Sequence, residues 1–329
     1  MNTKQTFRIA LTGHRPKDIG GYDFMSPINL TIAMKLREYL LSHLKQGKRI
    51  IAISGMALGA DQIFAKVALK LKNQGFSVAL EAAIPFFGQE RLWPEESQKV
   101  WNEITDQADF TTYTSTEKNY KPYLMQRRNE YLVDTCDELI AVYNGSGKGG
   151  TANCVAYAER KGKSIKRINP LGLVIDVKGD LLKSDCDVMF HQANCQGKMG
   201  AGLAKQIAEL YKEAYLADIN SPLKPEEKLG NFTYANVLSL QNKMIEVVNL
   251  YGQFRYGRDE QQTNYGALHA ALFSYLEDLQ NRIGSLTNLK LGVPKYMGCN
   301  LAGGEWSAVK KILEDAAEQF CVRIYTYQR

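Results

Sequence analysis

The sequence is poor in the residues that metal sites and disulfide frameworks require. Its 329 residues include only six cysteines and four histidines. No two cysteines form a C-x-x-C pair, and no histidine lies at zinc-site spacing from them. We therefore predict reduced, mainly structural thiols, and neither a bound metal nor another cofactor.

Long apolar runs are also missing. The longest, such as IIAISGMAL, are far too short to span a bilayer. The first residues, MNTKQTFRIALTGHRP, contain no basic segment followed by an apolar core and a cleavage site. The sequence thus predicts a cytoplasmic protein with no membrane partner.

Charge is unevenly distributed between the halves. Residues 1–170 carry 24 Lys+Arg against 17 Asp+Glu, a net charge of +7, which leaves −1 of the total of +6 for the remainder. A basic half favours an anionic partner such as a nucleotide. Its basic residues are scattered and form no Arg/Lys-rich arm, so nucleic acid is the less favoured partner.

The first half alternates strand and helix patterns, which is typical of a parallel sheet covered by helices on both faces. We predict strands within 7–13, 49–55, 77–86, 109–115, 138–145 and 164–170, and helices over 29–44, 60–72, 95–106, 124–134 and 151–161. The turn Asn169-Pro170-Leu171-Gly172 separates the last of these strands from a new one. The predicted domains are therefore 1–170 and 171–329.

The second half is again α/β, and a mixed sheet is expected. Its strand patterns lie within 173–179, 187–193, 231–238, 243–252, 288–296 and 321–328, and helical patterns cover 202–215, 265–282 and 305–320. The fold class that follows is a Rossmann-like, doubly wound parallel sheet followed by a second α/β domain.

Three glycine-containing turns follow strands of the first half: TGHRP (12–16), SGMALGAD (54–61) and NGSGKGGTAN (144–153). Glycines at a strand-to-helix joint let backbone amides approach a phosphate, and the helix N-terminus adds positive potential. A tight turn without a ligand is the alternative, but three turns at one sheet edge favour a nucleotide site. Its predicted residues are Gly13, His14, Arg15, Gly55, Gly59, Asp61, Arg128, Asn129, Gly149, Gly150 and Thr151.

These turns resemble the SLOG superfamily of Rossmann-like proteins, in the motifs GHRP, SGMALGADQIFA, MQRRNEYLVDTCDELIAVYNG and GKGGTANCVAYA. That group includes DNA-processing proteins and phosphoribohydrolases of nucleoside monophosphates. The phosphoribohydrolases carry a glutamate just after the glycine-rich loop, where this chain has Ala152, Asn153 and Cys154. The resemblance thus implies a domain that binds a nucleotide or an NAD-derived ligand without catalysis. It also implies a homo-oligomer.

The second half contains HQANCQGKMGAGLAKQI (191–207), in which three glycines fall within six residues at the start of a helical pattern. We expect a strand that ends at His191, followed by a bare loop whose amides lie against a diphosphate. A second glycine-containing loop, GCNLAGGEW (298–306), also follows a strand and precedes a helix.

The second half resembles a macrodomain, the fold that binds ADP-ribose. The resemblance lies in six motifs that match in order: KGDL, HQANCQGKMGAGLA, VVNLYGQFRYGR, TNYGALHAAL, VPKYMGCNLAGGEW and VRIYTY. The resemblance implies that Asp180 contacts adenine and Asn194 the distal ribose. A turn residue and a loop cap are their respective alternatives. The ligand site it implies comprises Asp180, Leu181, Asn194, Gly197, Met199, Gly200, Ala201, Gly202, Gly298, Cys299, Asn300, Leu301, Ala302 and Gly303.

The chemistry depends on the branch of that family. Glycohydrolases of the family use a lysine and an aspartate at positions that hold Leu250 and Ala302 here. HQANCQG instead resembles ADP-ribose 1″-phosphate phosphatases, which implies His191 and Asn194 as the catalytic residues, with His191 as base or nucleophile. The alternative for His191 is a structural histidine bonded to backbone.

The sequence thus predicts an ADP-ribose 1″-phosphate phosphatase or an ADP-ribosyl hydrolase, joined to a nucleotide-sensing domain. Both an enzyme and a binding protein are compatible with these motifs. The other hypothesis is a reader or sequestering protein for ADP-ribose or a cyclic derivative.

Overall fold

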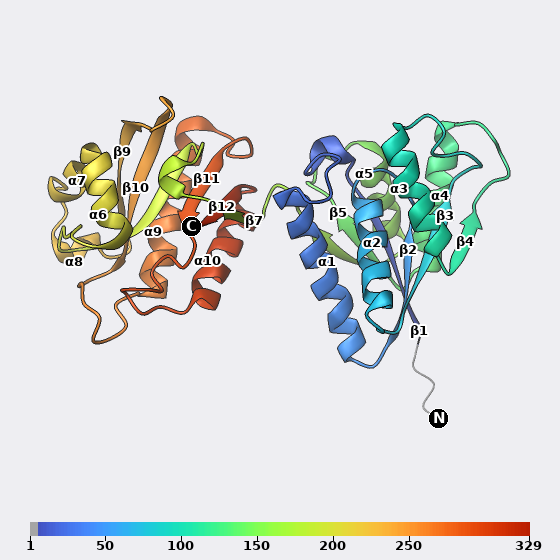
Figure 1. Ribbon diagram of the computed structural model, residues 1–329, viewed down its shortest axis with the longest axis horizontal. Coiled ribbons are helices and arrows are strands. Elements are labelled where there is room, and N and C mark those ends of the chain that lie inside the picture. Colours follow the sequence, from blue (N-terminus) through green and yellow to red (C-terminus); the bar gives the residue numbers. More distant parts are fainter. Residues whose placement is uncertain (1–5) are drawn as a thin grey trace. The chain divides into compact units, whose positions relative to one another are not determined.

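The computed structural model describes residues 6–329, and the chain divides into two compact units between Pro170 and Leu171. Each unit is a six-stranded sheet with helices on its faces (Figure 1). None of the helices in the described part of the chain combines the length and apolar composition needed to cross a membrane.

The sheet of the first unit is parallel throughout, with the order β4-β3-β2-β1-β5-β6. The chain runs outward from β1 to one edge, then returns to add β5 and β6 on the other side, so β1 and β5 flank the switch point. The elements are β1 (Thr6–Gly13), η1 (Pro16–Asp18), α1 (Pro27–Lys45), β2 (Arg49–Ser54), α2 (Ala60–Asn73), β3 (Val78–Ile84), α3 (Glu95–Gln107), β4 (Phe110–Tyr113), α4 (Pro122–Thr135), β5 (Glu138–Val142), α5 (Gly149–Arg160) and β6 (Ser164–Ile168).

The central strands of this sheet are apolar because both faces are covered, and the exception in β3 is Glu81, whose buried carboxylate pairs with Arg8 (2.7 Å). Every residue of β3 is buried, as are the residues of β5 after Glu138. A strand buried on both faces reads as a continuous apolar run, which is why these segments are recognisable in the sequence.

The second sheet is mixed, with the order β7-β12-β11-β8-β10-β9, and only β9 runs antiparallel to its neighbour. Its elements are β7 (Val174–Lys178), η2 (Leu181–Lys183), β8 (Val188–Asn194), α6 (Gly202–Leu210), α7 (Lys212–Ile219), α8 (Pro225–Lys228), β9 (Phe232–Leu238), β10 (Met244–Gln253), α9 (Tyr265–Ile283), β11 (Lys290–Pro294), α10 (Trp306–Gln319) and β12 (Arg323–Gln328). The predicted fold class is confirmed: a doubly wound parallel sheet followed by a mixed α/β sheet.

Alternate residues of β8 and β10 pack on opposite faces of the second sheet. Phe190, Val248 and Leu250 belong to the core under α9 and α10, whereas Met189 and Val247 pack with residues of α6 and α7. His191 and Asn249 therefore face the α6–α7 side, because they continue the odd-numbered series.

Two sequence predictions about this unit are wrong. The predicted helix 202–215 is two helices, because Tyr211 leaves the helical conformation (φ −126°, ψ 71°) and its buried side chain donates to the Leu182 carbonyl. The strand expected to end at His191 continues to Asn194, so His191 lies inside the strand, paired with Asn249.

Candidate functional site

The larger candidate site is a cleft of about 800 Å³ in the second unit, at the carboxyl end of β8. Its walls are the loop before α6 with the first turn of that helix, the loop after β11, and part of the segment after β10. The lining residues are His191, Gln192, Ala193, Asn194, Lys198, Met199, Gly200, Ala201, Gly202, Leu203, Ala204, Gln253, Tyr256, Gly257, Arg258, Pro294, Lys295, Tyr296, Met297, Gly298, Asn300, Leu301 and Ala302.

The charges of this cleft are of one sign. Lys198, Arg258 and Lys295 line it, and no aspartate or glutamate occurs among the residues of 6–329 that do. Lys295 is ion-paired with Asp176 (3.1 Å), which lies outside the lining, so its charge is partly neutralised. The free amides of the first turn of α6 add positive potential at the same wall. The cleft is therefore suited to an anion.

Asn194 closes the first loop on itself. Its Oδ1 accepts from the backbone amides of Gln196 (3.0 Å) and Lys198 (3.2 Å), and its Nδ2 donates to the Lys198 carbonyl (2.7 Å). Asn194 thus lines the cleft and also caps the loop, the alternative that the sequence left open. A ribose contact by its remaining N–H stays a prediction.

The second loop is held by a glutamine and a threonine below it. Gln192 Nε2 donates to Thr263 Oγ1 (2.9 Å), and Thr263 donates to the Gly298 carbonyl (2.6 Å). Gly298 has φ +72°, and a Cβ there would lie 2.4 Å from Gln192 Oε1. A glycine is therefore required at this position.

Five predicted ligand residues lie outside the cleft lining: Asp180, Leu181, Gly197, Cys299 and Gly303. Asp180 caps η2 by accepting from the Leu182 amide and pairs with Arg329 (2.8 Å). Leu181 is 4% exposed and packs in the core beside Met189. Their proposed contacts with a ligand stay predictions.

Two of the cysteines near the loops are poorly ionised. Burial raises the pKa of both Cys195 and Cys299 to about 11. Neither lines the cleft, and neither is a thiolate at neutral pH. Among the described residues, no group of three or more His, Cys, Asp or Glu is placed to hold a metal ion.

His191 is almost completely buried, at 2% exposure, and its ring contacts Asn249. Nε2 lies 2.6 Å from Asn249 Oδ1, and Nδ1 has no hydrogen-bond partner within the described chain. Burial lowers the pKa of His191, and the bond to Asn249 and the charge of Asp218 oppose this only in part. The imidazole is therefore neutral at pH 7 and can accept a proton.

The buried neutral His191 makes the stability of the chain pH-dependent. Below its ordinary pKa of 6.5 the unfolded chain takes up a proton that the folded chain does not, so acidification favours unfolding. We expect the wild type to lose up to about 1.4 kcal/mol per pH unit below that pKa relative to His191→Gln. Urea unfolding of both proteins at pH 7.5 and 5.5 measures this difference. His43, whose pKa burial also lowers, makes the same contribution in both proteins and cancels. Identical losses in the two proteins would contradict the assignment.

The first unit contains a second candidate site, a cleft of about 650 Å³ at the β1–β5 switch point. Nine of the predicted residues line it: Gly13, His14, Arg15, Asp61, Arg128, Asn129, Gly149, Gly150 and Thr151. His14 Nε2 accepts from the Asn144 amide (3.0 Å), and Thr151 Oγ1 donates to the Gly13 carbonyl (2.9 Å). These bonds tie the loops after β1 and β5 together.

A buried ion pair forms the floor of this cleft. Arg128 Nη1 lies 3.0 Å from Asp61 Oδ2, both side chains are less than 10% exposed, and Arg128 Nε has no partner in the described chain. Gly55 and Gly59 do not line the cleft. They permit close approach instead: a Cβ on Gly55 would lie 1.4 Å from Arg128 Nη1, and one on Gly59 would lie 2.5 Å from the His14 carbonyl oxygen.

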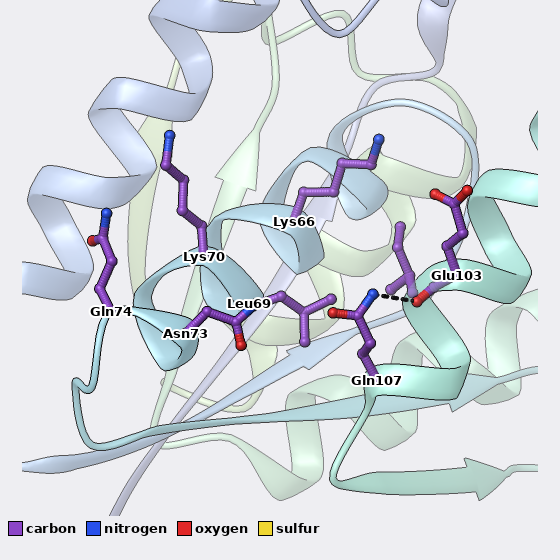
Figure 2. Close-up of a pocket in the computed structure, with 8 residues that line it drawn as sticks. Lys66, Leu69, Lys70, Asn73, Gln74, Glu103 and Gln107 are labelled. Atoms are coloured by element: carbon purple, nitrogen blue, oxygen red, sulfur yellow. Dashed lines mark hydrogen bonds between the residues drawn. The ribbon is translucent and has the colours of Figure 1, made fainter.

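A smaller hollow of about 350 Å³ lies between α2 and α3 (Figure 2). Lys66, Lys70 and Glu103 border it, and none of the residues predicted from the sequence does. Gln107 donates to the Glu103 carbonyl (2.9 Å) at its edge. This hollow is separate from the glycine-containing turns and carries no functional assignment.

The parallel sheet with a cleft at its switch point defines the first unit as a Rossmann-like domain. Residues 9–173 match the family described as the YspA SLOG family, and the chain belongs to that family. The resemblance of the first half to SLOG proteins is thereby confirmed.

This chain is similar in part to several relatives and solved structures. A UPF0398 protein of Bacillus pumilus is 27% identical over 151 residues, 46% of this chain and 81% of that protein. One from Bacillus cereus is 28% identical over 155 residues, 47% of this chain and 84% of that protein. The macrodomain of Mycobacterium tuberculosis DarG has a TM-score of 0.39 and 20% identity, covering 48% of this chain and 99% of that one. Thermosipho africanus DarTG, in complex with ADP-ribose, has a TM-score of 0.38 and 18% identity, covering 55% and 51%.

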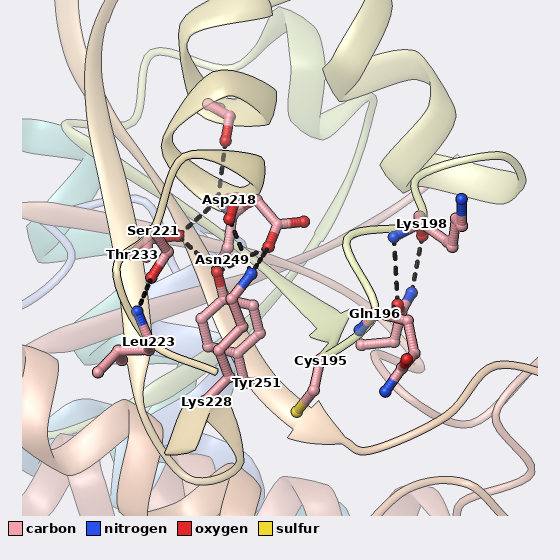
Figure 3. A network of polar contacts seen from close by, with 12 residues as sticks. Cys195, Gln196, Lys198, Asp218, Ser221, Leu223, Lys228, Thr233, Asn249 and Tyr251 are labelled. Atoms are coloured by element: carbon pink, nitrogen blue, oxygen red, sulfur yellow. Dashed lines mark hydrogen bonds and ion pairs between the residues drawn. The ribbon is translucent and has the colours of Figure 1, made fainter. Parts of the chain in front are cut away.

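Several residues of the second site are not recognisable as site residues from the sequence. Lys295 falls within the motif VPKYMGCNLAGGEW but is not among the residues predicted to bind the ligand. Asn249, Thr233 and Asp218 lie on three separate elements and meet only in the folded chain (Figure 3). Asn249 is a polar residue inside the apolar run VVNLY, which is the one feature that singles it out in the sequence.

Proposed function

We propose that the second unit binds ADP-ribose or a close derivative and hydrolyses its terminal 1″-phosphate. The observation that carries the proposal is the cleft itself: two loops kept bare by glycine, three cations, no lining carboxylate among the described residues and one unpartnered buried histidine nitrogen. Its volume lies within the usual range for a small-molecule site. The sequence resemblance to macrodomains names the ligand class.

In the proposed reaction, the loop amides and Lys198 hold the phosphates, and His191 Nδ1, which is shielded from solvent in this structure, takes a proton from a water that enters with the substrate. The water oxygen bonds to phosphorus, the bond from phosphorus to the 1″ oxygen breaks, and the proton passes from the imidazolium to the leaving oxygen. Inorganic phosphate and ADP-ribose are the products. Neutral imidazole is the form that this step requires, and burial maintains it.

The His191→Gln variant tests the catalytic part. We expect phosphate release from ADP-ribose 1″-phosphate to fall by about 10²–10⁴-fold, the usual contribution of a positioned base. Affinity for ADP-ribose, measured by calorimetry, should stay within a few-fold. The matched control is His269→Gln, since His269 is an exposed histidine of α9 stacked on Phe273, outside the cleft. Undiminished phosphate release in His191→Gln would refute the base assignment.

A second function is favoured by one observation. Leu250 is fully buried in the core, and Ala302 lines the cleft, where the glycohydrolases of the resembled family carry charged residues. A protein that binds ADP-ribose without turning it over fits this arrangement. Tight binding of ADP-ribose with no phosphate release by the wild type would support this reader and exclude the phosphatase.

For the first unit we propose binding of a nucleotide or an NAD derivative at the cleft beside Gly150. Substitutions that place a carboxylate in one cleft at a time test the two sites separately in the full-length chain. A Cβ added at Gly150 or at Gly200 would meet no heavy atom of residues 6–329 within 4 Å, so Gly150→Asp and Gly200→Asp introduce charge without a clash. We expect Gly150→Asp to abolish AMP or NAD binding and to leave ADP-ribose binding at the second unit intact. Gly200→Asp should do the reverse, and loss of both bindings in either variant would contradict two independent sites.

A further inference from the structure

A chain of polar groups, buried except for the half-buried Thr233, ends on His191, which lines the second cleft (Figure 3 shows most of its members). Its members are Asp218 of α7, Tyr251 and Asn249 of β10, Thr233 of β9, and His191 of β8. Asp218, Tyr251, Asn249 and His191 are each no more than 2% exposed. Four separate elements thus converge on one histidine that lines the cleft.

The direction of each hydrogen bond in this chain follows from what each atom has to donate. Asp218 pairs with Lys228 (2.8 Å), and its carboxylate can only accept. The single proton of Tyr251 therefore goes to Asp218 Oδ1 (2.8 Å), so the Tyr251 oxygen accepts from Thr233 Oγ1 (2.9 Å). The hydroxyl proton of Thr233 is thereby committed.

Asn249 is consequently fixed in one orientation. Thr233 Oγ1 can only accept a hydrogen bond from Asn249, because its own proton is used, and the Ala214 carbonyl can also only accept. Asn249 Nδ2 lies 2.9 Å from each of these two oxygens. Both N–H groups of the amide are used there, so Oδ1 faces His191 Nε2 at 2.6 Å. Because Oδ1 carries no proton, Nε2 of the histidine must donate, and Nδ1 is left with a free lone pair.

We propose that Asn249 is a positioning residue, which holds His191 as the Nε2–H tautomer so that Nδ1 is the nitrogen that serves the cleft. This inference rests on the proposed function for the role of Nδ1 toward water or a ligand hydroxyl. The tautomer itself follows from the hydrogen bonds alone. The hydrogen bonds that lead from Lys228 and Asp218 to Asn249 fix the orientation of the Asn249 amide. A reversed amide would place Asn249 Nδ2 against His191 Nε2 and move the ring proton to Nδ1.

Nitrogen NMR of the full-length, ¹⁵N-histidine-labelled chain tests the tautomer without any ligand. The chain has only four histidines, so the His191 signals are identified as those lost in His191→Gln. We expect an unprotonated Nδ1 and a protonated Nε2 in the wild type. A protonated Nδ1 in the neutral wild-type ring would overturn the proposal.

Variants of Asn249 separate positioning from packing. Asn249→Leu keeps the volume and removes the acceptor, so both tautomers should appear. We expect kcat for phosphate release to fall a few-fold, in proportion to the share of rings that carry the proton on Nδ1, with KM nearly unchanged. Asn249→Asp retains an acceptor for Nε2–H, so Nε2 should stay protonated, although the second carboxylate oxygen then faces the Ala214 carbonyl and loses the hydrogen bond that Nδ2 donates there. If packing were the only role, leucine would be tolerated at least as well as aspartate.

Thr233→Val serves if the Asn249 variants fail to fold, because it removes one of the two acceptors that orient the amide. We expect a detectable Nδ1–H population in this variant. Thr263→Val is its matched control, since Thr263 is a buried threonine bonded to Gln192 and Gly298 rather than to Asn249. An unchanged single tautomer in Thr233→Val would overturn the proposal. Failure of ADP-ribose to bind would instead refute the proposed function and leave the tautomer result standing.

Discussion

The Lys228→Met variant is expected to lose about 3–5 kcal/mol of unfolding free energy in the second unit. Lys228 is 5% exposed, and its Nζ donates to Asp218 Oδ1 (2.8 Å) and to the Asp218 carbonyl (2.7 Å). Without it, Asp218 is a buried carboxylate whose Oδ2 already has no partner in the described chain. The remaining charge can be neither solvated nor paired, so the cost exceeds the net value of the ion pair itself.

Urea unfolding, followed by NMR signals of β8 and β10, measures this loss. The matched control is Lys205→Met, which breaks an exposed pair with Glu209 on α6 (3.8 Å) and should cost less than about 1 kcal/mol. The double variant Lys228→Met/Asp218→Asn removes both charges and should be more stable than Lys228→Met alone. Equal stability of the Lys228 and Lys205 variants would contradict the description of a buried, mutually dependent pair.

The Gly55→Ala variant is expected to destabilise the first unit by about 3–5 kcal/mol, although it adds a single methyl group. That methyl would lie 1.4 Å from Arg128 Nη1 and 2.9 Å from Asp61 Oδ2. The guanidinium must leave its position, and Asp61 then loses its buried partner. Because Arg128 also lines the first cleft, nucleotide binding there should be lost as well.

Gly150→Ala is the control for this substitution. Gly150 lies in the first turn of α5, its φ is not in the left-handed region, and a Cβ would have no neighbour within 4 Å among the residues that the structure describes. Helix propensity should make this variant as stable as the wild type or slightly more stable. Unfolding curves for the two alanine variants provide the comparison, and a Gly55→Ala chain of wild-type stability would mean that Arg128 and Asp61 do not depend on each other.

The fold was largely predictable because its strands are apolar runs bounded by glycine, proline or asparagine. β5 is an example, since its residues after Glu138 are apolar and buried and leave an unambiguous pattern. The break at Tyr211 was not predictable, because a tyrosine continues a helical pattern locally. Its departure from the helix depends on a buried bond to Leu182, 29 positions earlier in the chain.

The candidate sites were predictable to the extent that backbone forms them. Glycine-containing loops at strand ends, such as Gly200–Gly202, are visible in the sequence and line the clefts. Side chains that act through tertiary contacts were not visible: nothing local connects Asn249 to Thr233 and His191. Asp180 illustrates the converse, since its motif implies a ligand contact while its carboxylate pairs with Arg329, at the other end of the unit's sequence.

The suppressed ionisation of the cysteines near the second cleft has a practical consequence. With a pKa of about 11, each of Cys195 and Cys299 is deprotonated in only about one molecule in 10⁴ at pH 7. Cys195 is in addition only 1% exposed, so alkylating reagents will modify it chiefly when the unit opens. The rate of Cys195 labelling therefore measures opening of the second unit, and a ligand that binds the unit should slow it.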